Sequence, residues 1–342
     1  MVELNGKKIL VTFLMHLGDL TLTTPFIHAL RKAAPDARIT MLVDEKLKDV
    51  VLFNPYLDEV VTIDKKGRDN SILSLWACSR HLSKLDFDVL INLHPNERCS
   101  FIDAMTSVKL RTGTTHKIFK CFWDVFTPLD RSMHAADMYL DVLQQLGVQD
   151  LSNNGLEIFP GEEHFLEAEL FWQEQNITDQ DKLIGFNIGS AVPTKRWPPE
   201  RFAEVADIFA AKGYKTVFFG GPMDEEMVAE ATGYMQTRPI IATGHFAIGG
   251  LAAAMRRCCL IITNDSGPMH VAISQKVPIV AMYGPSNPKL YGPYTKDAVI
   301  VTAQPPCQGC ADGMKHSCDD LQCMSRMTVE QVVAAADTML NK

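Results

Sequence analysis

Two glycine-bearing turns, far apart in the chain, carry side chains that could handle a proton and an anion. The first is His16-Leu17-Gly18-Asp19, and the second is Asn264-Asp265-Ser266-Gly267-Pro268-Met269-His270. Each follows an apolar segment typical of a strand and opens a segment typical of a helix, whose N-terminal N–H groups can hold an anion. Together the two turns indicate transfer of a group from an activated phosphate donor.

The first turn contains the candidate base. Gly18 would let the backbone approach a ligand closely, and Asp19 could accept the proton of an attacking hydroxyl. The alternative is that Asp19 only caps the following helix, a role that aspartate often fills.

Three further segments supply candidates for binding the donor. Residues 189–202 combine glycine, two cations and prolines that preset a helix start, which favours phosphate binding over a solvated basic turn. The loop 283–288 follows a predicted strand at the same edge, although it could be a simple turn rich in glycine and proline, just as 265–270 could be a plain helix start. Glu225 follows another predicted strand and could bind ribose hydroxyls or merely favour its helix N-terminus. The donor-binding candidates are Gly18, Ser190, Thr194, Arg196, Glu225, Asp265, Ser266, Gly267, Pro268, Met269 and His270, with Lys195 as the phosphate-binding cation.

Four of the nine cysteines lie close together near the end of the chain. Their spacing, Cys307-x2-Cys310-x7-Cys318-x4-Cys323, is compatible with a tetrahedral zinc site of structural type. A reduced knot without metal is the alternative.

The elements that must position these residues alternate between strand and helix, as a parallel sheet requires. Strands are expected at 8–13, 39–43, 60–63, 89–93, 183–188, 216–219, 239–242, 260–263 and 278–283. Helices are expected at 22–34, 71–85, 133–146, 162–175, 199–212, 224–235, 248–256, 269–274 and 328–340. A chain of 342 residues is longer than a single hydrophobic core usually serves. The polar stretch 148–182 interrupts the alternation, so we expect domains at 1–165 and 166–327.

The overall charge restricts the class of partner. The net charge is −8 and the pI is about 5.7, which argues against a general nucleic-acid binder, so local groups must hold any anionic ligand. The apolar run after Lys7-Lys8 is typical of a first strand rather than a signal peptide, and no stretch has the length of a membrane span. We expect a cytoplasmic protein that is at most peripheral on a membrane.

The motifs resemble those of glycosyltransferase family 9, the ADP-heptose:lipopolysaccharide heptosyltransferases. The matching pieces, in the order of the family, are 17–19 with 24–25 and 31–32, then 193–198, 263–267 with His270, and 284–285 with Pro288. The resemblance implies a GT-B fold, with two Rossmann-like parallel-sheet domains facing a central cleft and the helix 328–342 packing back on the first domain.

The resemblance also implies a reaction: an inverting, metal-independent transfer of heptose from ADP-heptose to the inner core of lipopolysaccharide. Asp19 would be the general base, Lys195 would bind donor phosphate, and residues 265–269 would bind the donor. No cofactor is implied for catalysis, and fixed cations and N–H dipoles would stabilise the departing ADP.

The acceptor is expected in the first domain, at a basic and aromatic segment. Lys117 and Lys120 would meet an anionic, lipid-linked sugar at the inner face of the membrane, although solvated lysines over buried aromatics are the alternative. Two other functions stay open: another GT-B enzyme that uses a UDP-sugar, and a nucleotide-sugar binding protein without turnover. A nicotinamide oxidoreductase is disfavoured because no G-x-G-x-x-G follows the first strand.

Overall fold

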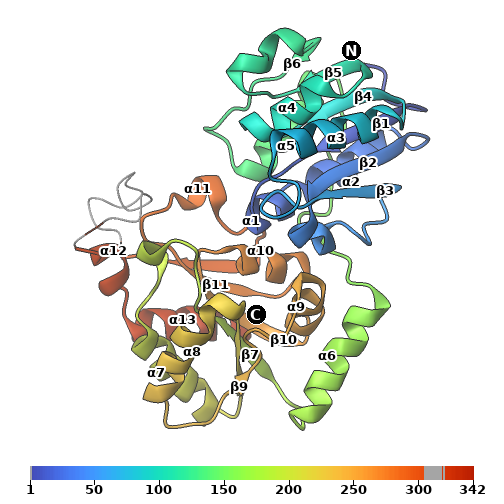
Figure 1. The fold of residues 1–342 in the computed structure, drawn as a ribbon. Helices are drawn as coiled ribbons and strands as arrows, with labels where there is room; N and C mark the ends of the chain where they lie inside the picture. The colour runs from blue at the N-terminus through green and yellow to red at the C-terminus, as the bar shows by residue number, and fades with distance from the viewer. Residues whose placement is uncertain (1, 304–317, 319) are drawn as a thin grey trace. The chain divides into compact units, whose positions relative to one another are not determined.

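The computed structural model describes residues 2–303, 318 and 320–342, and it divides the chain into two units, Met1–Phe159 and Pro160–Lys342 (Figure 1). The division falls earlier than the expected boundary after residue 165. Its physical reason is helix α6 (Glu162–Glu174), which packs against α9 (Ile248–Met255) of the second unit.

The first unit is built on a six-stranded parallel sheet with the order β3-β2-β1-β4-β5-β6. Its central strands are almost continuously apolar because helices cover both faces. The strands are β1 (Lys8–Thr12), β2 (Arg38–Asp44), β3 (Glu59–Ile63), β4 (Phe87–Asn92), β5 (Val108–Gly113) and β6 (Val125–Phe126).

Five α-helices and two short 3-10 helices connect these strands. The helix expected at 22–34 is α2, with Pro25 in its first turn, where the missing N–H costs nothing, and the short helix α1 precedes it. The elements are α1 (Leu17–Thr21), α2 (Thr24–Ala33), η1 (Glu45–Val50), α3 (Ile72–Ser83), α4 (Glu97–Met105), η2 (Lys117–Phe122) and α5 (Ala135–Gln145).

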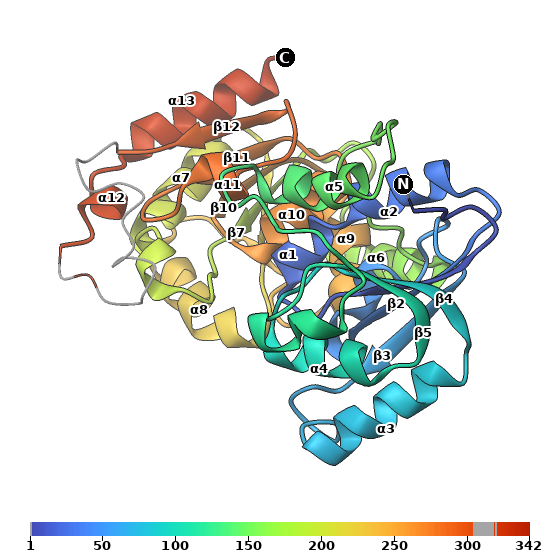
Figure 2. The same cartoon turned by 90° about the horizontal axis from the view of Figure 1, so that it is seen from above.

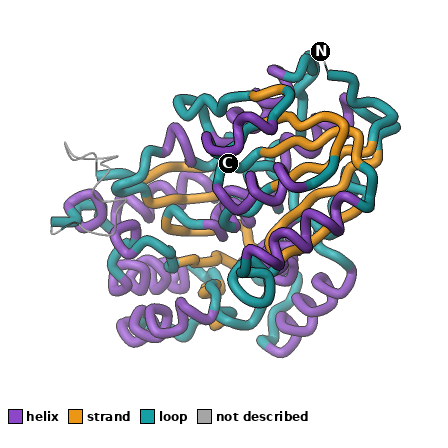
Figure 3. The backbone as a smooth tube through the Cα atoms, turned by 45° about the horizontal axis from the view of Figure 1, so that its top comes forward, coloured by secondary structure: helices purple, strands orange, loops and turns teal. Residues whose placement is uncertain are grey.

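The second unit repeats this topology. Its sheet has the order β12-β11-β10-β7-β8-β9, again with every pairing parallel, and Figure 3 shows the strands of both units in orange. The strands are β7 (Leu183–Asn187), β8 (Lys215–Phe219), β9 (Ile240–Ile241), β10 (Cys258–Asn264), β11 (Ile279–Met282) and β12 (Ala298–Val301). Counted within its own unit, each sheet has the strand order 3-2-1-4-5-6 of a Rossmann fold.

The helices of the second unit cover the sheet and contribute to one large core. They are α6, α7 (Pro199–Ala211), α8 (Glu225–Tyr234), α9, α10 (Gly267–Ser274), α11 (Pro288–Tyr291), α12 (Gln322–Ser325) and α13 (Val329–Leu340), with the 3-10 turns η3 (Pro193–Lys195) and η4 (Pro222–Asp224). Among the residues described, no helix has the length and apolarity needed to cross a membrane.

The last helix, α13, belongs to the second unit. It packs against β10, β11, β12 and α7, and its residues Val332, Ala336 and Met339 share a core with Trp197. The resemblance implied packing on the first domain instead. Burial of this apolar face on the second sheet explains the observed position, because an amphipathic helix is held where its apolar stripe is covered.

Candidate active site

The strand order determines where a ligand can reach each sheet. In a 3-2-1-4-5-6 sheet the connections diverge between strands 1 and 4, which leaves a crevice beyond their carboxyl ends. In the first unit these strands are β1 and β4, and in the second they are β7 and β10. The predicted base Asp19 follows β1, and the two predicted donor segments follow β7 and β10.

In the second unit a buried amide joins the two strand ends. Asn187 and Thr263 are neighbours in the β7–β10 register. The Asn187 side-chain N–H₂ donates to Thr263 Oγ1 at 3.1 Å and to Ser266 Oγ at 2.8 Å. Ser266 is the N-cap residue of α10 but makes no side-chain capping bond to the first turn. Asn187 therefore holds the start of α10 in place, and the Ser266 hydroxyl does not cap the N–H groups of the first turn.

Asp265 links three of the predicted segments. It is 5% exposed, and its Oδ2 lies 2.7 Å from Lys195 Nζ and also accepts a hydrogen bond from Ser286. Its backbone carbonyl accepts a bond from Ser190 Oγ at 3.4 Å. The segments 189–202, 264–270 and 283–288 thus meet at one carboxylate, as their positions after neighbouring strands predict.

The turn that carries Lys195 is fixed by its own backbone contacts. Arg196 Nε donates to the Ser190 carbonyl at 2.9 Å, and the N–H of Trp197 donates to Asn264 Oδ1 at 3.1 Å. Asn264 in turn donates to the carbonyl of Ile188 at 2.7 Å. Arg196 therefore acts on the loop itself, and Asn264 and Trp197 are supporting residues to which the sequence analysis gave no role.

The predicted donor residues of α10 differ in exposure. Ser266, Gly267 and Pro268 are partly exposed, whereas Met269 and His270 are buried. A ligand at this helix end can reach the first three residues, and the last two serve the core below it. Thr194, in the 3-10 turn before Arg196, is buried as well.

Glu225 stands apart from this cluster. It is the first residue of α8 and is exposed, and its Oε1 lies 2.6 Å from the position that a Cβ on Gly244 would take. The neighbouring Asp224 accepts a hydrogen bond from the Gly221 N–H at 2.9 Å and packs against Gly189, where a Cβ would come within 2.2 Å of Asp224 Oδ1. Asp224, rather than Glu225, touches the loop that follows β7.

Tyr283 is a buried phenol next to Asp265. Burial, together with the charge of Asp265, raises the pKa of this phenol well above its usual value. It therefore stays neutral and donates to the carbonyl of Tyr291 at 2.9 Å. The hydroxyl thereby ties the end of β11 to α11.

In the first unit, Asp19 is half-buried in the short helix α1. A lysine that the sequence analysis missed supports the turn before it. Lys65 Nζ donates to the carbonyls of Leu14 and Met15, at 2.8 and 3.0 Å, and pairs with Asp44 Oδ2 at 3.1 Å. Lys65 follows β3 and Asp44 ends β2, so the strands beside β1 hold the turn that presents Asp19.

Beside this turn lies a neutral polar group at the end of β4. His94 is 7% exposed, and burial, with nearby Lys65 and His16, lowers its pKa to about 4. Its backbone N–H donates to Asn92 Oδ1 at 2.6 Å. The imidazole is therefore uncharged at neutral pH. The sequence offered a signal for His94, because this residue directly follows the strand expected at 89–93 and so lies at the same sheet edge as Asp19.

A buried carboxyl group lies beneath the first switch point. Asp103 is fully buried, Thr12 Oγ1 donates to its Oδ2 at 2.8 Å, and burial raises its pKa to about 8. Asp103 is therefore largely protonated at neutral pH. The sequence does not indicate the contact between Asp103 and Thr12, because the two residues lie 91 positions apart in the chain.

The predicted acceptor segment separates into two parts. Lys117 and Lys120 are exposed on η2, and Lys120 Nζ lies 4.2 Å from the centre of the Phe126 ring. Trp123 is buried and donates from Nε1 to the Thr112 carbonyl at 3.0 Å. Trp123 thus supports the segment from below, while the two lysines are exposed to solvent.

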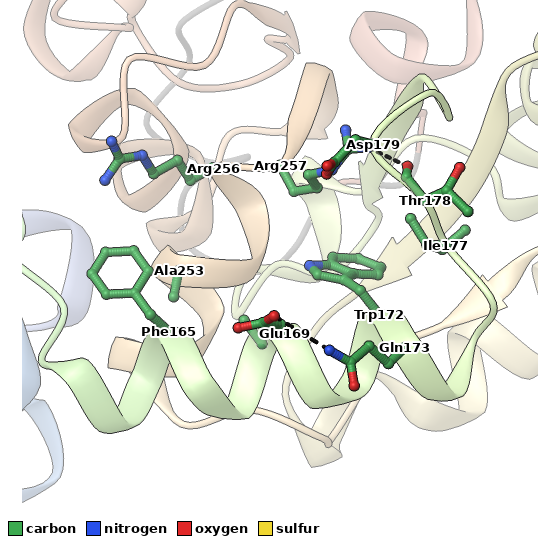
Figure 4. A pocket seen from close by; sticks show the side chains of 11 residues that line it. Phe165, Glu169, Trp172, Gln173, Ile177, Thr178, Asp179, Ala253, Arg256 and Arg257 are labelled. Carbon is green, nitrogen blue, oxygen red and sulfur yellow. Dashed lines mark hydrogen bonds between the residues drawn. The ribbon is translucent and has the colours of Figure 1, made fainter.

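A hollow of about 790 Å³ lies elsewhere on the second unit (Figure 4). Phe165, Glu169 and Trp172 line it from α6, and Arg256 and Arg257 lie across from them. Arg257 donates to the carbonyls of Thr178 and Asp181, just before β7. The hollow is thus at the amino ends of β7 and β10, opposite the edge where a Rossmann sheet binds its ligand.

The cysteine cluster is only partly described. Cys307 and Cys310 lie outside the described residues, so the predicted zinc ligands cannot be placed as a set. Cys323 is buried in α12, against Gly284, where a Cβ would come within 3.1 Å of its Sγ. In the described ranges, no group of three or more histidine, cysteine or acidic side chains could hold a metal ion.

Comparison with known proteins decides the family. The model of glycosyltransferase family 9 (heptosyltransferase) matches residues 75–318. The chain belongs to this family. It is 24% identical to lipopolysaccharide heptosyltransferase 3 of Escherichia coli K12 over 341 residues, which cover 94% of this chain and 95% of the relative.

Solved structures agree with this assignment. A glycosyl transferase family 9 structure from Veillonella parvula DSM 2008 matches with a TM-score of 0.95 and 53% identity, over 99% of both chains. The E. coli ADP-heptose LPS heptosyltransferase II matches with a TM-score of 0.79 and 21% identity, over 98% of both chains. The expected α/β class, the GT-B fold and the glycosyltransferase assignment are confirmed.

Proposed function

We propose that this family 9 glycosyltransferase transfers heptose from ADP-heptose to the inner core of lipopolysaccharide, with inversion at the anomeric carbon and without a metal ion. The names of the relatives support the sugar and the acceptor. The observation that carries the proposal is the meeting of Lys195, Asp265 and Ser286 beside the N-terminus of α10.

The second unit binds the donor. Lys195 has three N–H donors, of which one is directed to Asp265, so the ammonium group can also meet a phosphate oxygen. Asp265 and Ser286 set the position of Lys195, and the N–H groups of α10 add a fixed dipole. Negative charge grows on the diphosphate as it departs, and groups already in place stabilise it without reorganisation. Glu225, exposed at the start of α8 and apart from this cluster, is the proposed partner of the ribose hydroxyls.

The first unit activates the acceptor. Asp19 accepts the proton of the acceptor hydroxyl while its oxygen bonds to the anomeric carbon. The bond from that carbon to the phosphate oxygen breaks, and ADP leaves with the electron pair. One displacement inverts the configuration and needs no cofactor, because Lys195 and the helix dipole supply the positive charge.

Lys117 and Lys120 meet the anionic acceptor, which is linked to lipid. The protein then works in the cytoplasm, as a peripheral protein at the inner face of the cytoplasmic membrane. Cys307, Cys310, Cys318 and Cys323 have a structural role, as a zinc site or as reduced thiols.

The central test separates proton transfer from donor binding. Asp19→Asn keeps the size of the side chain and removes its basicity, so we expect transfer from ADP-heptose to truncated lipopolysaccharide to fall about 10²–10⁴-fold. Calorimetry should find the affinity for ADP unchanged. Asp86→Asn is the matched control, because Asp86 is exposed before β4 with φ 55°, a conformation that asparagine tolerates.

The same measurements distinguish the alternatives. Tighter binding of UDP than of ADP would assign the chain to an enzyme that uses a UDP-sugar. ADP binding without transfer by the unmodified chain to any inner-core acceptor would identify a binding protein. Full activity of Asp19→Asn would remove Asp19 from the mechanism.

A further inference from the structure

Helix α3 exposes a face that is apolar at one end and basic at the other. Ile72, Leu73 and Trp76 are 67%, 75% and 50% exposed, in the first turns of the helix. Arg80 and Lys84 follow on the same side at a spacing of four residues, and both are exposed. We propose that this face docks the protein on a bilayer that contains anionic phospholipid.

The opposite side of α3 is already used. Leu75 and Leu82 are buried in the core with Leu10 and Leu90 of the first sheet, and α3 also packs against α4. Figure 2 shows α3 along the outside of its unit. The exposed apolar side chains are therefore not left over from the core, and their burial must come from outside the unit.

The charge of the helix points to an anionic partner. No acidic residue occurs between Ser71 and Leu85, although the whole chain has a net charge of −8. In the part of the chain that the structure describes, no ion pair engages Arg80 or Lys84. Arg80 instead lies over the Trp76 ring, at 5.5 Å from its centre. An interfacial helix combines these features, with an aromatic at headgroup level and cations toward the lipid phosphates.

The position of α3 agrees with this role. The helix begins after β3, so its apolar end lies at the carboxyl edge of the first sheet, which also carries Asp19 and η2. On η2, Ile118 and Phe122 are exposed beside Lys117 and Lys120. A bilayer on α3 would bring a lipid-linked acceptor to that edge. The docking itself does not depend on which sugar is transferred.

Tryptophan fluorescence can test the docking directly. The chain has four tryptophans, and Trp123, Trp172 and Trp197 are at most 9% exposed, so Trp76 alone can respond to an added surface. With vesicles of phosphatidylethanolamine and phosphatidylglycerol, we expect a blue shift of the emission and quenching by brominated lipid. Vesicles of phosphatidylcholine alone should give a much weaker response.

Two substitutions make the test specific. Leu73→Glu should weaken vesicle sedimentation about tenfold or more, since it removes an apolar side chain and adds a charge of the wrong sign. Leu166→Glu is the matched control: Leu166 is 57% exposed on α6, a helix with five glutamates, and its substitution should leave sedimentation unchanged. Thermal unfolding should show that both variants are folded.

Three outcomes would overturn the proposal: no sedimentation of the unmodified chain with anionic vesicles, equal losses for both variants, or a dimer that Leu73→Glu converts to a monomer while vesicle binding persists. The last would show that a second copy covers α3. Transfer from ADP-heptose to a detergent-dispersed acceptor should be the same for Leu73→Glu and the unmodified chain, so failure of the docking and failure of the enzymatic proposal can be told apart.

Discussion

The two sheets share one strand order but place different chemistry at their carboxyl ends. Beyond β1 and β4 lie Asp19, an uncharged His94 and a turn held by Lys65. Beyond β7 and β10, Lys195 and Asp265 form a close ion pair beside a helix N-terminus. One edge is suited to moving a proton and the other to holding an anion.

The difference teaches how one topology serves two tasks. The switch point determines where a ligand can be reached, whereas the residues just after the strands determine what is done there. In the first unit burial keeps His94 and Asp103 uncharged, and the ion pair of Lys65 with Asp44 holds the turn before Asp19. In the second unit the buried Asp265 is instead paired with Lys195 next to the start of α10.

At the second edge, the largest effect should come from removing its cation. Lys195→Met should lower transfer about 10²–10³-fold, the usual loss for one group that stabilises developing negative charge. Calorimetry should also find a lower affinity for ADP in Lys195→Met, whereas Asp19→Asn should leave that affinity unchanged. Lys182→Met, at the exposed amino end of β7, is the control. Unchanged ADP affinity in Lys195→Met would mean that the two edges are not divided as proposed.

The buried carboxyl group of the first edge should show itself in the pH dependence of stability. The pKa of Asp103 is about 8 in the folded chain and about 4 in an unfolded one, so the folded state binds the extra proton between these values. Its contribution therefore falls as the pH rises to 8. Buried His94, with a pKa of about 4, has the opposite effect up to about pH 6.5, its usual value.

Urea unfolding above that pH isolates the aspartate. Between pH 6.5 and 9 the unmodified chain should lose about 2 kcal/mol of unfolding free energy relative to Asp103→Asn, whose amide cannot ionise. Asp130→Asn, in an exposed turn, should behave as the unmodified chain does. Parallel curves for the chain and Asp103→Asn would show that Asp103 is not protonated in the fold.

Much of this could be predicted from the sequence. The strands of both sheet centres are short apolar runs between turn residues, and their positions alone brought Lys195, Asp265 and the 283–288 loop to one edge. The sequence analysis expects no element between residues 94 and 132, because α4 buries Ser100 and Asp103, which hides its apolar periodicity. The edge strands β6 and β12 are short and partly exposed, so they give little signal.

The supporting contacts could not be predicted, for a physical reason. Lys65 donates to backbone carbonyls, which every residue carries, so the side chains of the 13–16 turn do not reveal the contact. The lysine is also about 50 positions away in the chain. Asp103 looks like a surface acid in sequence, since only tertiary packing buries it. Packing also placed α13, whose apolar stripe suits either sheet equally well in sequence.

The smallest effect should come from this lysine, and it concerns how the first edge is held. Lys65→Met removes the two bonds to the Leu14 and Met15 carbonyls and leaves Asp44 buried without its cation. We expect kcat to fall about tenfold, because a misplaced base transfers the proton less often. The KM for ADP-heptose and the affinity for ADP should not change if, as proposed, the second unit binds the donor.

Lys65→Arg should keep part of the activity that Lys65→Met loses, because a guanidinium can reach the same acceptors. Lys66→Met, at the exposed neighbour, is the control and should have the kcat of the unmodified chain. A purely structural role for Lys65 would lower kcat only in proportion to the fraction of folded enzyme. A fall in kcat per folded molecule, with the donor KM constant, would instead show that the turn before Asp19 needs its anchor, and a rise in the donor KM would contradict the division between the two edges.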